Sequence, residues 1–285
     1  MVEDIRLFLN YLAKEKKCSK NTLDAYNNDL SQLVEYLSSL PDQDVNTFDA
    51  RLLDEERMKL YMQHLKEKNY KLSTIARKIA AARTFLRFMA ERGRVKESLT
   101  EQLAAPRINK QMPRALSVQD IRRVLDESAR LPTSNGRRDR AMLELLYATG
   151  MLASELMALN VDDFDAVAGT ITVNSQKEKK RVIKLDKRVS GMIKEYIEVH
   201  RINLLSDEKQ KALFLNQRGD RLTRQGFWQI VQNYADLAGL TVKVTPRAIR
   251  HSYAVHKLNA GEDVHLVQEV LGHAHVSTTK VYKQG

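Results

Sequence analysis

Residues 105–114 divide the chain, because this stretch contains Pro106 and Pro113, carries basic and amide side chains, and lacks any apolar periodicity. Proline removes a backbone donor and disfavours helical geometry in the residue before it. Such a composition is typical of an extended linker. The chain is therefore expected to form two domains, residues 1–104 and 115–285.

The amino-terminal domain is expected to be a bundle of four helices. Its first helical pattern places Ile5, Phe8, Leu9 and Leu12 on one face. The other three patterns run from the predicted N-cap Ser19 to Tyr36, from Leu53 to Lys68 and from Ser73 to Arg92. Gly93 is a natural stop for the last of these helices.

The carboxy-terminal domain is predicted to be mainly helical with one small β-sheet. Ser117 and Asp120 form a capping-box-like start to its first helix. Two short strands, 170–175 and 181–186, are expected on either side of a charged turn at 176–180. Helices are expected over residues 137–149, 188–201, 223–238, 246–260 and 264–271.

Charge points to a polyanionic partner. The 47 Lys and Arg residues outnumber the 36 Asp and Glu residues, which leaves a net charge of +11. Nucleic acid is the favoured partner, and a merely basic globular protein is the alternative.

Cys18 is the only cysteine, which excludes an intrachain disulfide and a cysteine-based metal cluster, and no cofactor or metal is expected. No apolar run is long enough to span a membrane, so a cytoplasmic, nucleoid-associated protein is expected.

Three segments in a fixed order carry a family likeness. Residues 138–150, followed by Ser154-Glu-Leu156, resemble the first signature box of the tyrosine site-specific recombinases, the phage integrase family. Residues 245–253 resemble the second box and 271–282 the third, and the likeness is closest to Xer-type members. It implies an amino-terminal core-binding (SAM-like) domain and a catalytic-type domain that form a C-shaped clamp on double-stranded DNA. It also implies assembly with itself or a related recombinase on paired half-sites.

The resemblance also implies a chemistry. In this family a tyrosine attacks a DNA phosphate to form a 3′-phosphotyrosyl bond, and two arginines bind the phosphate without any metal. A lysine on the hairpin protonates the leaving oxygen. On this likeness Tyr282 matches the nucleophile, Arg250 the second arginine and His273 the histidine of the third box.

Three other positions depart from the family pattern. Leu152 stands where the first arginine is expected, Gln176 where the hairpin lysine is expected, and Arg247 where a histidine is usual. Leucine cannot contact phosphate by charge, and glutamine is no practical proton donor. Arg247 keeps a hydrogen-bond donor but loses a group that titrates near neutral pH. A neighbouring hairpin lysine, Lys177 for instance, is the alternative proton donor.

Phosphate contacts are expected from basic side chains of both domains, and an ordinary solvated charge is the alternative for each. The candidates are Arg77, Lys78, Arg83, Lys110, Arg221 and Arg224. Only three residues follow Tyr282, where Xer-like chains usually continue into another helix. Weaker assembly is one expectation from this, and a sequence that has been shortened is the alternative.

Two functions remain open. One is a recombinase, either weakly active or fully active through a shifted hairpin lysine. The other is a non-catalytic accessory or regulatory DNA-binding protein. A topoisomerase IB-like enzyme shares the chemistry but would not carry these boxes. Leu152 and Gln176 favour impaired catalysis.

Overall fold

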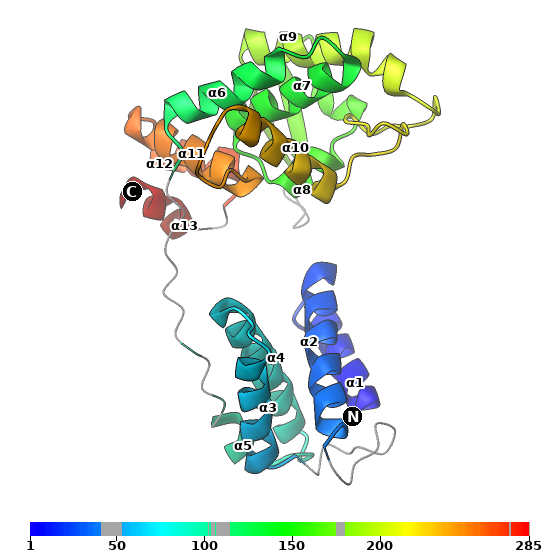
Figure 1. The fold of residues 1–285 in the computed structure, drawn as a ribbon, viewed down its shortest axis with the longest axis vertical. Helices are drawn as coiled ribbons and strands as arrows, with labels where there is room; N and C mark the ends of the chain where they lie inside the picture. The colour runs from blue at the N-terminus through cyan, green and yellow to red at the C-terminus, as the bar shows by residue number, and fades with distance from the viewer. Residues whose placement is uncertain are drawn as a thin grey trace. The chain divides into compact units, whose positions relative to one another are not determined.

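The computed structural model divides into two compact units, residues 1–111 and 112–285, and each has its own apolar core (Figure 1). The linker expected at 105–114 lies outside the described residues except for Pro106, so its limits stay a prediction. Within the described part of the chain, no helix is long and apolar enough to cross a membrane. The structure describes residues 1–40, 53–101, 103, 106, 115–174, 180–273 and 275–284.

Unit 1 is a helical bundle with an aromatic centre. Phe8 is fully buried, and its ring lies 5.4 Å from that of Phe85 and 5.2 Å from that of Phe88, centre to centre. Four long helices confirm the four helical patterns of the sequence, and the Ser19 side chain caps the second as predicted. The short α5 was not expected. The helices are α1 (Val2–Lys14), α2 (Lys20–Ser38), α3 (Glu55–Glu67), α4 (Leu72–Ala90) and α5 (Ser98–Glu101).

Lys78 of α4, one of the candidates for a phosphate contact, is buried inside unit 1 instead of lying on an exposed helix face. Its side chain is 3% exposed, and its Nζ lies 3.2 Å from Asp29 Oδ1 and 2.6 Å from Gln32 Oε1. Asp29 is itself buried on α2, which packs against α4, and a buried carboxylate requires a cation. The neighbouring Arg77 also pairs with Asp29, with its side chain half exposed.

Unit 2 is mainly helical, and α7 runs through its core. Met142, Leu143, Leu145 and Leu146 of this helix are all fully buried. Helix α6 begins with the predicted capping box, in which Ser117 and Asp120 hydrogen bond to each other's backbone. The helices are α6 (Val118–Ala129), α7 (Ser134–Thr149), α8 (Ala153–Ala158), α9 (Lys187–Glu195), α10 (Arg224–Leu237), α11 (Pro246–Asn259), α12 (Val264–Leu271) and α13 (Val276–Lys280).

The sheet of unit 2 has three antiparallel strands in the order β1–β2–β3. Strands β2 (Thr170–Asn174) and β3 (Lys180–Lys184) confirm the predicted pair, and the short β1 (Phe164–Asp165) was not expected. Residues 175–179 of the charged turn lie outside the described part of the chain.

Leu116, near the start of unit 2, is hydrogen bonded to α11 through both its backbone amide and its backbone carbonyl. The amide of Leu116 donates to Ser252 Oγ at 2.8 Å, and its carbonyl lies 2.9 Å from His256 Nε2. A carbonyl only accepts, so Nε2 of His256 carries the proton and Nδ1 accepts from the Tyr147 hydroxyl at 2.8 Å. Leu116 is thereby fixed to α11.

Candidate active site

A glycine turn brings three helices of unit 2 together. Helix α7 ends at Gly150, which adopts a φ of +57°. A β-carbon there would lie 2.3 Å from the Tyr253 ring and 2.9 Å from Leu271, so any larger residue clashes with α11 and α12. The turn that follows α7 therefore lies directly against the helices that carry the second and third boxes.

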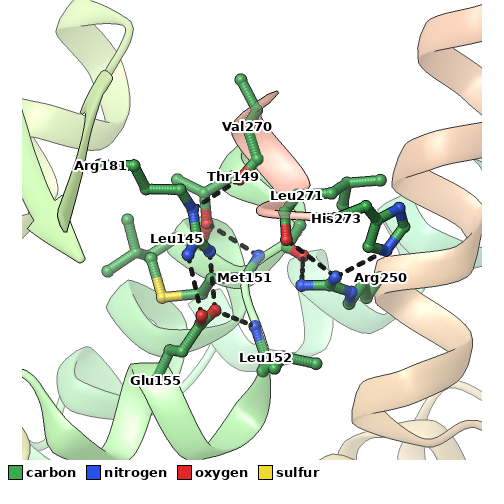
Figure 2. Close-up of polar contacts among 11 residues, drawn as sticks. Leu145, Thr149, Met151, Leu152, Glu155, Arg181, Arg250, Val270, Leu271 and His273 are labelled. Atoms are coloured by element: carbon green, nitrogen blue, oxygen red, sulfur yellow. Dashed lines mark hydrogen bonds and ion pairs between the residues drawn. The ribbon is translucent and has the colours of Figure 1, made fainter. Parts of the chain in front are cut away.

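Arg250 of α11 is hydrogen bonded to backbone carbonyls of the first and third boxes (Figure 2). It is 8% exposed. Its Nη1 donates to the Gly150 carbonyl at 2.8 Å, and its Nη2 donates to the Leu271 carbonyl at 3.0 Å. Nη2 also lies 3.0 Å from His273 Nε2. A guanidinium carries about five N–H groups, so two of them stay available to a ligand.

His273 is a neutral side chain with a defined tautomer. Because Arg250 stays protonated, Nε2 of His273 accepts from it, and Nδ1 donates to Thr279 Oγ1 at 2.9 Å. Burial and the charges of Arg250 and Arg181 lower the pKa of His273 to about 4. In the free protein this histidine therefore binds Arg250 as an acceptor.

Tyr282 lies beside His273. The two rings stack at 6.0 Å between centres with 26° between their planes, and the Tyr282 ring meets that of His251 edge-on at 5.0 Å. Tyr282 also packs on an apolar cluster that includes Tyr253 and Leu271. The structure thus brings Arg250, His273 and Tyr282 together, in line with their match to three residues of one active site in the family that the sequence resembles.

These residues line an open pocket of about 640 Å³, called here the Arg250 pocket. Its wall combines side chains from α8, α10, α11 and the segment after α12. Leu152, Arg224, Arg247, Arg250, His251, His273, Thr278 and Tyr282 are among the lining residues.

Leu152 forms an apolar part of this wall. The residue is 46% exposed, and its amide donates to Glu155 Oε2 at 2.8 Å, which fixes the start of α8. The position expected to hold a phosphate-binding arginine is therefore open to the pocket but carries no donor on its side chain. Arg247, on the first turn of α11, is exposed and lines the same pocket.

Arg181 is the site residue that sequence reasoning missed. It extends from β3, donates Nε to the Val270 carbonyl at 2.8 Å, and binds both carboxylate oxygens of Glu155 at 2.8 and 2.7 Å (Figure 2). Burial raises the pKa of Glu155, but the bonds from Arg181 and the Leu152 amide outweigh burial and lower it. The glutamate of the Ser-Glu-Leu motif was the available signal, since a buried carboxylate needs a cationic partner.

The side chains expected to contact DNA differ in their exposure and in the partners that they already bind. Arg83 and Arg224 are exposed, and Arg224 lies at the start of α10 beside the Arg250 pocket. Arg221 instead donates to the carbonyls of Met157 and Leu159 and to Asn160 Oδ1, so its guanidinium is engaged within unit 2. Lys78 is buried, as described above. Lys110, Gln176 and Lys177 lie outside the described residues.

Lowering the pH from 7 to 5 is expected to destabilise unit 2. Burial lowers the pKa values of His251, His256 and His273. Unfolded histidine titrates near about pH 6.5, whereas His273 in the folded protein titrates near 4. Between these two pH values the unfolded chain binds more protons than the folded chain, so the free energy of unfolding decreases as the pH is lowered.

Fluorescence of Trp228, the only tryptophan, would follow the thermal unfolding of unit 2. His273→Gln keeps an acceptor for Arg250 and is expected to remove about 1 kcal/mol of this pH dependence, after discounting for partial exposure. An unchanged pH dependence in that variant would show that His273 does not resist protonation.

Comparison with known proteins decides the family. Residues 114–285 match the phage integrase family, and residues 5–93 match the phage integrase N-terminal SAM-like domain. The chain belongs to the phage integrase family. The expected family and its two domain types are thereby confirmed.

Within the phage integrase family the chain is Xer-like. It is 40% identical to the tyrosine recombinase XerC of Roseiflexus sp. (strain RS-1) over 284 residues, which cover 99% of this chain and 89% of that protein. It is 35% identical to the XerD of Staphylococcus epidermidis (strain ATCC 12228 / FDA PCI 1200), covering 98% of this chain and 92% of the relative. The crystal structure of the XerH recombinase bound to its difH substrate has the same fold, with a TM-score of 0.73 and 21% identity over 99% of this chain and 80% of that one.

Proposed function

We propose that this protein binds DNA as a Xer-like member of the tyrosine recombinase family and cleaves DNA strands poorly or not at all. Leu152 carries this proposal. In the family's reaction, negative charge builds on the phosphate oxygens, and two arginines bind them. Here Arg250 lies in the pocket, but an exposed leucine side chain faces the space where its partner is expected.

The sequence of the hairpin between β2 and β3 also favours weak or absent DNA cleavage. Gln176 stands at the lysine position, so the leaving 5′ oxygen has no proton donor at that position. Removing one donor to developing charge costs about 10² to 10³ in rate, and the losses of residues that act together do not simply multiply. Recognition of DNA does not require this chemistry, because Lys and Arg contacts with the phosphates supply most of the affinity.

An active recombinase is the second candidate, and the arrangement of Arg250, His273 and Tyr282 favours it. In that case Tyr282 attacks the phosphate and a neighbouring hairpin lysine such as Lys177 supplies the proton. Both candidates share the partners that the family suggests. These are double-stranded DNA of the nucleoid and a second recombinase subunit, either this chain or a relative, on the paired half-site.

A nicked suicide substrate distinguishes the two candidates. The duplex would carry a site that the full chain selects from a random DNA library, with a nick that lets the released fragment diffuse away. We expect no covalent adduct, or a trace, on a denaturing gel. A Xer recombinase on its own site provides the positive control, and an adduct yield similar to that control would overturn the proposal.

Replacing Tyr282 by phenylalanine is expected to abolish any trace of adduct, because the variant lacks the attacking hydroxyl. Noncovalent affinity for the same duplex is expected to stay within about tenfold of the parent, about 1.4 kcal/mol, since one neutral hydrogen bond is lost. Fluorescence anisotropy would measure the affinity. An adduct that persists in Tyr282→Phe would rule out Tyr282 as its source.

A further inference from the structure

The Arg250 pocket contains two arginines that the rest of the described chain leaves unengaged. Arg224 and Arg247 are both exposed, and neither has a hydrogen bond or ion pair from its side chain to any described residue. Arg250 differs, because three of its N–H groups already bind the protein. An incoming anion would therefore meet Arg247 and Arg224 without having to break an existing contact.

The position of Arg247 is suited to act together with Arg250. The two residues are three apart on α11, and residues at this spacing lie on the same side of a helix. Both line the pocket, and the charge of Arg247 adds to burial in lowering the pKa of His251. The positive charge of Arg247 thus reaches the interior of the pocket.

The pocket has a surplus of positive charge. Glu155 is the acidic residue among its described lining residues, and both of its oxygens are bound by Arg181. His273 is neutral because its pKa lies near 4. The guanidinium groups of Arg224, Arg247 and Arg250 are therefore not balanced by any free carboxylate in the described wall.

We propose that Arg247 replaces the missing arginine of position 152, so that one DNA phosphodiester is bound by Arg247 and Arg250 from a single helix, with Arg224 beside them. This proposal rests on the proposed function. An arginine side chain carries a permanent positive charge and can donate two parallel hydrogen bonds to a phosphate, neither of which a neutral histidine can do.

Such an arrangement would bind a phosphate without activating it. Two arginines on opposite sides can share the charge that develops over all the nonbridging oxygens. Arg247 and Arg250 both extend from α11, whereas position 152, on a different element of the wall, carries an apolar side chain. The same pocket would then contribute to DNA affinity while giving little stabilisation to the transition state.

A double-mutant cycle between positions 152 and 247 tests this idea. All variants would carry Tyr282→Phe, so that only noncovalent binding to the selected duplex is measured. Arg247→Ala is expected to weaken binding about 10- to 100-fold, as for a lost charged hydrogen bond. In a Leu152→Arg background the same change is expected to cost no more than about threefold, because the restored arginine binds the phosphate instead.

A matched control and a modified DNA sharpen the test. Arg218→Ala removes an exposed arginine of unit 2 outside the Arg250 pocket, and its cost is expected to be the same in both backgrounds. Duplexes with a single neutral methylphosphonate would be compared position by position. At one position the modification is expected to weaken the parent but not Arg247→Ala.

Two results would overturn the inference. One is an Arg247→Ala cost that is equal in both backgrounds or absent, and the other is a methylphosphonate scan with no position that depends on Arg247. Thermal unfolding followed by Trp228 fluorescence would show that each variant is folded. An adduct yield from the unmodified chain similar to that of the Xer control would instead contradict the proposed function, and it is measured separately on the suicide substrate.

Discussion

Replacing Leu152 by arginine is expected to raise the yield of covalent protein–DNA adduct by about 10²- to 10³-fold, the usual effect of one donor to developing charge. The backbone at this position is already fixed by the Gly150 turn and by the bond from the Leu152 amide to Glu155. The side chain is open to the pocket that contains Arg250 and Tyr282. A suicide-substrate assay on the selected site would measure the gain.

Gln176→Lys added to Leu152→Arg is expected to raise the yield further by supplying a proton donor for the leaving oxygen. Leu152→Gln is the matched control, since it lengthens the side chain and adds a donor without adding charge. A double variant that cleaves no better than Leu152→Gln would show that the block lies elsewhere, in the shape of the site or in assembly on DNA.

DNA affinity is expected to fall by about 10³- to 10⁵-fold when the salt concentration rises from about 50 to about 200 mM, as for a protein that contacts about six to ten phosphates. The net charge of +11 and the exposed arginines of both units, among them Arg83 and Arg224, motivate this expectation. Anisotropy titrations at several salt concentrations would give the slope of the logarithm of the binding constant against the logarithm of the salt concentration.

Single variants would show which arginines contribute to that slope. Arg224→Gln is expected to reduce it by about one, the effect of one lost phosphate contact, while Arg221→Gln is expected to act mainly on stability. Arg221 differs because its donors already bind Met157, Leu159 and Asn160. Affinity that is insensitive to salt would contradict phosphate-dominated binding.

Local patterns in the sequence predicted much of this fold. The capping box of Ser117 and Asp120 and the N-cap at Ser19 depend on residues a few positions apart, so sequence alone could identify them. The resemblance of the three boxes to those of the tyrosine recombinases implied that Arg250, His273 and Tyr282 meet in one site.

Tertiary contacts could not be predicted in the same way. Lys78 resembles any lysine on a helix face, and only the packing of α2 against α4 brings Asp29 to its ammonium group. Arg221 and Arg181 are likewise fixed by partners far away in the sequence. The burial and partners of such cations depend on the meeting of distant segments, which periodicity does not describe.

The fixing of Leu116 to α11 has a mechanical consequence. Leu116 is bound through both its amide and its carbonyl, to Ser252 and His256, and α11 also carries Arg247 and Arg250. A displacement of Leu116 would therefore act directly on the helix that carries Arg247 and Arg250, as well as on the unit 2 core in which Leu116 is buried.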